Sequence, residues 1–145
     1  MMKYSFDKSL GNISRMISKS LGKSLEAKLT ARDIFITAEQ WSVLSLLFQK
    51  KKLTQIEIGT LLGLDKVQIV RIIDILEKEQ LVQRVISPTD KRFKNVNLTP
   101  KGIEIYHKIV PYATNVHADA FSSISEEDIK QCLATLEKIN NNLKH

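Results

Sequence analysis

The sequence has little cysteine, proline or glycine, and it has no long uninterrupted apolar segment. Its 145 residues include one cysteine, Cys132, which excludes an intramolecular disulfide and a thiolate metal cluster. Five glycines and three prolines exclude collagen-like and linker-like chains. No segment approaches the roughly 18 apolar residues that a membrane-spanning helix needs, and the first residues lack the apolar run of a signal peptide. We therefore expect a cytoplasmic protein without a membrane span.

Charge is distributed unevenly along the chain. The formal net charge is +6, from 22 Lys and Arg against 16 Asp and Glu. Residues 50–101 hold eleven basic and six acidic residues, a net of +5, whereas residues 102–145 hold four and six, a net of −2. A basic segment in an otherwise balanced chain favours a polyanionic partner such as nucleic acid, although a solvated basic surface has the same composition.

Both ends of the chain show long helical patterns. Near the N-terminus, apolar residues recur in steps of three or four: Phe6, Leu10, Ile13, Ile17, Leu21, Leu25 and Leu29. Near the C-terminus, Thr99-Pro100 starts a helix that reaches Phe121 and that Pro111 should kink. Ser125 starts a last helix with the stripe Ile129, Cys132, Leu133, Leu136, Ile139 and Leu143. Stripes of this length need a partner surface, which a second chain could supply.

The middle of the chain predicts a helix-turn-helix. Thr37 and Gln40 form one expected capping box, followed by the apolar face Trp41, Val43, Leu44, Leu47 and Phe48. After an expected short strand at Leu53, Thr54 and Glu57 form a second box. That box opens a short helix in which Ile58, Leu61 and Leu62 should be buried and which Gly63 ends as a left-handed cap. Asp65 and Gln68 then start a longer helix that runs to about Gln80, with Ile69, Ile72, Ile73 and Leu76 buried.

The period then changes from 3.6 to 2. Residues 82–86 and 93–98 alternate as strands, and residues 87–92 form a charged, turn-rich loop between them. Two strands that follow a helix-turn-helix form a winged helix. The predicted fold is therefore mainly α with a small β wing.

This chain resembles the multiple antibiotic resistance regulator (MarR-type) family of bacterial transcription factors. The resemblance rests on four stretches in family order and spacing, with Asp90-x-Arg92 between two strands: ITAEQWSVLSLL (36–47), LTQIEIGTLLGLDKVQIVRIIDILEKEQLVQR (53–84), SPTDKRFKNVNLTPKG (87–102) and SISEEDI (123–129). The chain departs from the family at Gln80, where the family has Gly. It also departs at Val67, Gln68 and Val70, where the family is rich in Ser and Thr.

The resemblance implies a homodimeric regulator, most often a repressor, that binds a palindromic site on double-stranded DNA. Residues 1–36 and 100–145 would form the dimerisation region, and residues 37–99 the winged helix-turn-helix. A small, often anionic aromatic ligand would bind between these regions and release the protein from DNA. The sequence names no ligand contacts. No cofactor or metal is implied.

Seven residues are candidates for DNA contact. At the start of the longer helix, Gln68 suits adenine, Arg71 suits guanine, and Val67 could pack on a thymine methyl group. Gln68 could instead act only as a cap, and Arg71 could instead hold a phosphate. The resemblance places Arg92 in the minor groove with Asp90 orienting its guanidinium, whereas an exposed ion pair is the simpler interpretation. The full candidate set is Lys66, Val67, Gln68, Arg71, Asp90, Lys91 and Arg92.

Other chemistry finds little support. The sequence has no Gly-rich phosphate loop, nucleophile elbow or metal-ligand spacing, so we expect no enzyme. His107 and His117 lack further ligands in register and are expected to be ordinary helix residues. Cys132 lies on an apolar stripe, which favours a small buried side chain. Two alternatives remain open: an oxidant sensor acting through Cys132, and a winged-helix adaptor that binds proteins and not DNA.

Overall fold

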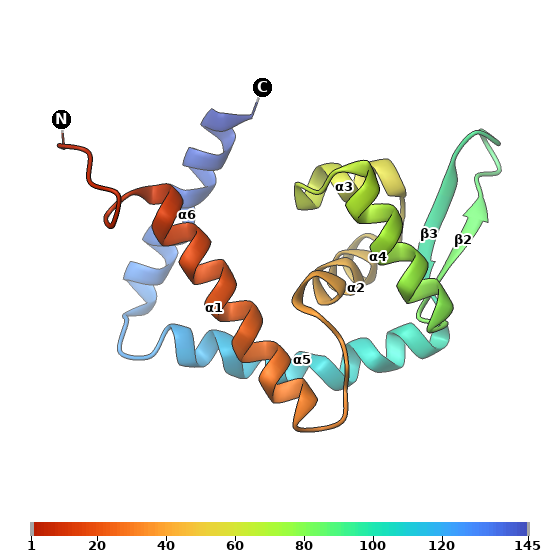
Figure 1. Ribbon diagram of the computed structural model, residues 1–145, viewed down its shortest axis with the longest axis horizontal. Coiled ribbons are helices and arrows are strands. Elements are labelled where there is room, and N and C mark those ends of the chain that lie inside the picture. The colour runs from red at the N-terminus through yellow and green to blue at the C-terminus, as the bar shows by residue number, and fades with distance from the viewer. Residues whose placement is uncertain (1, 145) are drawn as a thin grey trace.

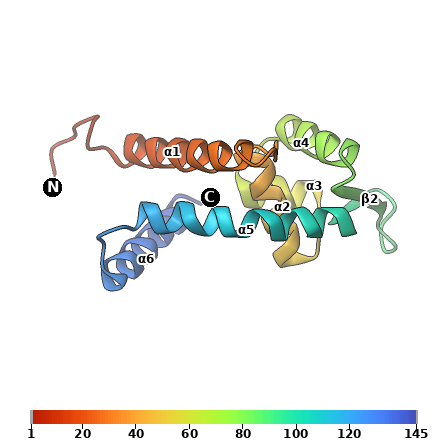
Figure 2. The same ribbon diagram turned by 90° about the horizontal axis from the view of Figure 1, so that it is seen from below.

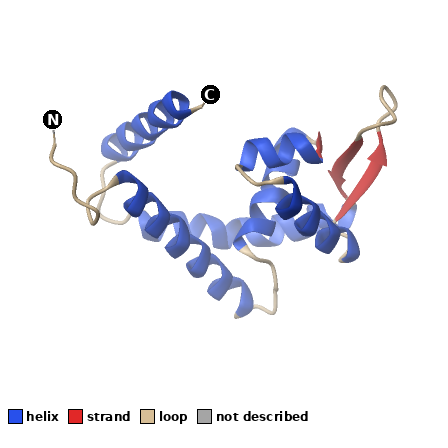
Figure 3. Cartoon of the chain, turned by 45° about the horizontal axis from the view of Figure 1, so that its top comes forward, coloured by secondary structure: helices blue, strands red, loops and turns tan. Residues whose placement is uncertain are grey.

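The computed structural model describes residues 2–144 and is mainly helical, with one small sheet. The elements are α1 (Leu10–Thr30), α2 (Ala38–Lys50), β1 (Lys52–Thr54), α3 (Gln55–Leu62), α4 (Lys66–Lys78), β2 (Val82–Ile86), β3 (Lys94–Leu98), α5 (Pro100–Ala120) and α6 (Glu126–Leu143). The strands form an antiparallel sheet in the order β1-β3-β2. Figure 3 shows the sheet at one end of the molecule, far from both termini. This arrangement confirms the predicted winged helix.

Each of the six helices is preceded by an N-cap residue, whose side-chain oxygen accepts a backbone N–H of the first turn. These residues are Ser9, Thr37, Thr54, Asp65, Thr99 and Ser125. The sequence predicted all except Ser9. Because Ser9 accepts the Asn12 N–H, α1 begins at Leu10, and Phe6 lies outside the helix and is exposed.

One predicted capping box forms only in part. The Glu57 N–H donates to the Thr54 hydroxyl at 3.2 Å. The Thr54 hydroxyl in turn donates to Glu57 Oε1 at 3.1 Å, so the Glu57 carboxylate does not accept the Thr54 N–H. Thr54 also ends β1, where it is paired with Asn95. The same helix contradicts the expected burial of Leu61, which is 55% exposed. The buried face of α3 passes through Ile58 and Gly59, and Leu61 points away from it.

The core lies where α2, α3 and α4 meet the sheet and the first half of α5. The largest fully buried side chains include Leu44, Leu47, Ile58, Ile73 and Leu76. The C-terminal half of α1 joins this core through Leu25 and Leu29. α1 contacts α5 and crosses it at an angle, as Figure 1 shows. α5 continues without interruption past Pro111.

α6 and the first half of α1 present uncovered apolar faces. No residue of α6 is buried, and Leu133, Leu136 and Leu143 are exposed. Figures 1 and 2 show α6 projecting from the end of α5, away from the winged helix. Cys132 is exposed in this chain, so the prediction that it is buried is wrong. Among residues 2–144, no other helix or strand covers the face of α6 that carries it.

Candidate nucleic-acid interface

The turn before α4 sets the direction of this helix. Gly63 adopts φ 66 and ψ 32, the left-handed conformation that glycine accepts without strain. The Leu64 N–H then donates to the Gly59 carbonyl at 2.8 Å. α4 therefore starts after a tight turn, and its first residues lie at the surface. The left-handed cap that the sequence predicted at Gly63 is confirmed.

The first turn of α4 is fastened by a complete capping box. The Gln68 N–H donates to Asp65 Oδ1 at 2.8 Å, and the Asp65 N–H donates to Gln68 Oε1 at 3.0 Å. The capping role of Gln68 is confirmed. Because the cap uses its carbonyl oxygen, the Gln68 side chain has only its amide NH₂ group left to donate outward.

Three other candidates on α4 are exposed. Lys66 and Arg71 are exposed, and Val67 is 78% exposed. Val67, Val70 and Arg71 line a shallow apolar depression together with Lys66. The opposite face of α4 holds the buried residues Ile69, Ile72, Ile73 and Leu76, as predicted. The helix therefore presents a mixed cationic and apolar face to the outside.

The wing tip carries an organised ion pair. The Arg92 Nε donates to Asp90 Oδ1 at 3.0 Å, and Arg92 Nη2 donates to Oδ2 at 2.7 Å. The Arg92 backbone N–H adds a third bond to Oδ1 at 3.0 Å. These bonds from the Arg92 guanidinium and backbone lower the pKa of Asp90, and the carboxylate raises the pKa of Arg92. The Arg92 side chain remains 83% exposed, so the guanidinium is oriented and still accessible.

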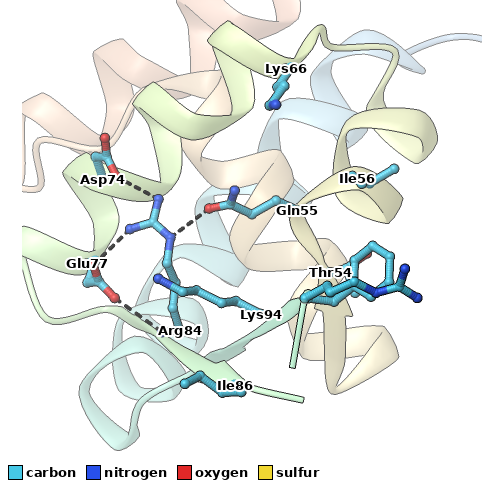
Figure 4. Close-up of a pocket in the computed structure, with 11 residues that line it drawn as sticks. Thr54, Gln55, Ile56, Lys66, Asp74, Glu77, Arg84, Ile86 and Lys94 are labelled. Carbon is cyan, nitrogen blue, oxygen red and sulfur yellow. Dashed lines mark hydrogen bonds and ion pairs between the residues drawn. The ribbon is translucent and has the colours of Figure 1, made fainter. Parts of the chain in front are cut away.

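The structure brings Lys66 and Arg92, from the two predicted contact regions, to one groove. This groove has a volume of about 840 Å³ and lies between α4, the start of α3 and the wing. Figure 4 shows its interior, where Lys66 and Lys94 lie around a central Arg84. The half-buried Asp90 and the exposed Lys91 do not line the groove, and neither do Val67, Gln68 and Arg71.

Sequence reasoning missed Arg84. Its side chain is 14% exposed and pairs with Asp74 and Glu77 on α4, at 2.6 and 2.8 Å. Its Nε also donates to Gln55 Oε1 of α3 at 2.6 Å. A signal was present: Arg84 is a charged residue two positions from the buried Val82, on the same strand face.

Residues 2–144 give no support for a metal site or for a membrane-spanning helix. No group of three His, Cys, Asp or Glu side chains is placed to hold a metal ion, so His107 and His117 have no such cluster around them. Every helix in this part of the chain is too short or too polar to cross a bilayer.

Known proteins are similar to this chain in both sequence and fold. The MarR family model matches residues 36–94. The HTH-type transcriptional regulator MhqR of Bacillus subtilis (strain 168) is 31% identical over 105 residues, 72% of each chain. The structure of an S. aureus MepR–DNA complex matches with a TM-score of 0.81 and 28% identity, over 97% of this chain and 100% of that one. A mutant E. coli MarR complexed with operator DNA matches with a TM-score of 0.80 and 25% identity, over 90% and 92%. The winged helix and this shared sequence show that the chain belongs to the MarR family of transcriptional regulators, which are not enzymes.

Proposed function

We propose that this protein is a homodimeric repressor that binds a palindromic operator on double-stranded DNA. The observation that carries the proposal is the pairing of an exposed recognition face on α4 with an oriented, accessible Arg92 at the wing tip. Two cationic elements separated by a groove match the alternation of major groove, phosphate backbone and minor groove along B-DNA. The MepR and MarR structures that share this fold were determined with DNA, which supports the proposal.

The contact residues have distinct roles. Val67 packs on a thymine methyl group, the Gln68 amide donates to a base edge, and Arg71 reads guanine or holds a phosphate. Lys66 and Lys91 attract phosphates. Arg92 enters the minor groove with its guanidinium held by Asp90. These contacts divide into phosphate positioning and base readout, and only the second kind selects a sequence.

Dimerisation would cover the apolar faces that the single chain leaves open. Ile13 and Ile17 of α1 are exposed, as are Leu133 and Leu136 of α6, and soluble monomers seldom expose so much contiguous apolar surface. We therefore assign residues 1–36 and 100–145 to a dimerisation region and residues 37–99 to the winged helix.

Sedimentation velocity tests the dimer. Wild type should sediment as a dimer at micromolar concentration, and Leu133→Glu/Leu136→Glu as a monomer, because each Glu would place a charge in the interface. The control Gln131→Glu/Ala134→Glu adds the same charge on the opposite face of α6 and should remain dimeric. A wild-type monomer would contradict this part of the proposal.

A cavity suited to an anionic aromatic ligand lies at the junction of the two regions. It has a volume of about 730 Å³ and is bordered by three cationic and two acidic side chains, with Phe35 and Tyr112 supplying aromatic surface. The cations are Arg32, Lys101 and Lys108, and the acidic residues are Asp33 and Glu79. The Arg32 guanidinium lies 6.0 Å from the centre of the Tyr112 ring. A ligand that prefers one spacing of the two winged helices would shift the population away from the DNA-binding arrangement.

DNA titration at two salt concentrations is the main test. The protein should bind the promoter fragment that it protects, and its affinity should fall steeply as salt rises, because phosphate contacts release counterions. Benzoate is a suitable probe for release, and Lys108→Ala should weaken its effect. If the protein binds no DNA even at low salt, the result would favour the alternative of a winged-helix adaptor that binds other proteins.

A further inference from the structure

One guanidinium joins three elements of the winged helix. Arg84 of β2 bonds to Asp74 and Glu77 of α4 and to Gln55, the first residue of α3. The Arg84 backbone N–H also donates to Glu77 Oε2 at 3.2 Å. In Figure 4 the guanidinium lies between these three side chains. The backbone N–H and the guanidinium of Arg84 are therefore both bonded to α4, the recognition helix.

The base of the wing is held in the core by Val82 and Val96 and by the pairing of β3 with β1, but the end of β2 beyond Arg84 has few attachments. β2 is an edge strand that pairs only with β3, and its last two residues, Val85 and Ile86, are exposed. Beyond Ile86 the chain continues into the loop that carries Asp90 and Arg92. Arg84 is thus the last residue of β2 whose side chain bonds to a helix, and it lies at the point where the exposed part of the wing begins.

We propose that Arg84 is a positioning residue that fixes the wing relative to the recognition helix, so that Arg92 and the first turn of α4 can engage DNA together. The inference rests on the proposed DNA-binding function. Its energetic basis is preorganisation: a wing already held at the right angle loses little conformational freedom on binding. Without Arg84, each wing would lose conformational freedom on binding DNA, and this entropy loss would weaken binding.

Electrostatics alone and a positioning role for Arg84 predict opposite changes in DNA affinity when the Asp74 and Glu77 carboxylates are removed. Asp74 and Glu77 border a groove that would face the phosphate backbone. Removing two carboxylates should tighten DNA binding by simple electrostatics. If the carboxylates act by anchoring Arg84, their removal should instead weaken binding, because the wing loses its support.

The experiment measures operator affinity for a set of variants at two salt concentrations. Arg84→Gln should bind roughly fivefold or more weakly than wild type, comparable with the loss of an Arg contact to DNA. Asp74→Asn/Glu77→Gln, which retains Arg84, should also bind more weakly. The charge-matched control Glu39→Gln/Glu127→Gln removes two exposed carboxylates that lie outside the groove, and it should bind as tightly as wild type or more tightly. Thermal unfolding of each variant checks that it folds.

A double variant separates positioning from direct contact or simple destabilisation. If Arg84 acts through the wing, Arg84→Gln/Arg92→Ala should bind no more weakly than Arg92→Ala alone. Additive losses would overturn the proposal, as would tighter binding by the carboxylate variant. If Arg84→Gln does not fold, the carboxylate variant and its combination with Arg92→Ala supply the same comparison. Wild type that binds no DNA would refute the proposed function itself, a result distinct from additive losses.

Discussion

The backbone of Gly102 lies directly against the carbonyl oxygen of Leu81. A Cβ atom at Gly102 would lie 2.0 Å from that oxygen, far inside van der Waals contact. Two bonds hold the pair in place: the Thr99 N–H donates to Leu81 O at 3.1 Å, and the Gly102 N–H donates to Thr99 Oγ1 at 3.0 Å. The first turn of α5 therefore packs against Leu81, in the segment that joins α4 to β2.

Gly102→Ala should destabilise the protein because no flexible side chain can move out of the way of the new methyl group. We expect the free energy of unfolding to fall by about 3 kcal/mol, the upper range for overpacking. Gly11→Ala is the control: nothing lies within 4 Å of its Cβ position, and a helical alanine should stabilise by about 0.5–1 kcal/mol. Urea unfolding at one protein concentration measures both changes. A Gly102→Ala variant as stable as wild type would contradict this packing.

Gln80→Gly should stabilise the fold. Gln80 has φ 63, the left-handed conformation that costs a residue with a Cβ about 1 kcal/mol. Glycine removes that cost and retains the bond from Thr99 Oγ1 to the Gln80 carbonyl. Lys78→Gly, two residues earlier and still inside α4, should instead lose about 0.5–1 kcal/mol. Thermal unfolding distinguishes them, and stabilisation of both or neither would refute the backbone argument.

Much of the fold could be predicted because local chemistry specifies it. Capping residues and apolar periods identify the helix-turn-helix, the two wing strands and the four buried residues of α4. Family resemblance added one detail of the backbone: Gly is usual where Gln80 stands, and Gln80 indeed adopts a left-handed conformation. The Asp90–Arg92 pair was predictable because the two residues are only two apart.

Features that depend on tertiary contacts could not be predicted. Periodicity indicates that Leu61 and Cys132 belong to apolar stripes, but only the packed structure shows which stripes this chain covers. The place of Arg84 on the same strand face as the buried Val82 can be read from the sequence, but its contact with Gln55, 29 positions away, cannot. The DNA-contact roles of Lys66, Val67, Gln68, Arg71, Asp90, Lys91 and Arg92 remain predictions.

Cys132→Ala should leave DNA affinity unchanged. Figure 1 shows α6 far from α4 and the wing, so the change does not touch the candidate DNA-contact residues. Peroxide should therefore release wild type and Cys132→Ala from DNA equally, or release neither. Gel-shift titrations with and without peroxide test this. Release of the wild type alone would favour the oxidant sensor.

The wing ion pair should resist acid. Arg92 lowers the pKa of Asp90 below its ordinary value of 3.8. The pairing is therefore fully present above that value and is lost only as pH falls through the lowered pKa. An NMR titration of the Asp90 carboxyl carbon should show a midpoint below 3.8 in wild type and a higher midpoint in Arg92→Ala. Lys91→Ala, which leaves the pair intact, should titrate as wild type. A midpoint that Arg92→Ala does not move would mean that the pair is absent in solution.

Arg92→Ala should weaken operator binding most among the wing variants. A guanidinium in a narrow minor groove gains from the concentrated negative potential there. Its removal should cost roughly 1–3 kcal/mol per wing, and up to about twice that if both wings of a dimer engage. Asp90→Ala should cost less, because Asp90 only orients the guanidinium through bonds of 2.7–3.0 Å.

Lys91→Ala separates charge from groove contact at the same wing tip. Lys91 is exposed and pairs with no carboxylate among residues 2–144, so its loss should weaken binding to all DNA sequences alike and reduce the salt dependence. Arg92→Ala should instead weaken operator binding more than binding to unrelated DNA. Titrations on both DNAs at two salt concentrations measure the difference. If Arg92→Ala binds the operator within about twofold of wild type at both, a change of only ~0.4 kcal/mol, the wing does not contact DNA and the adaptor gains support.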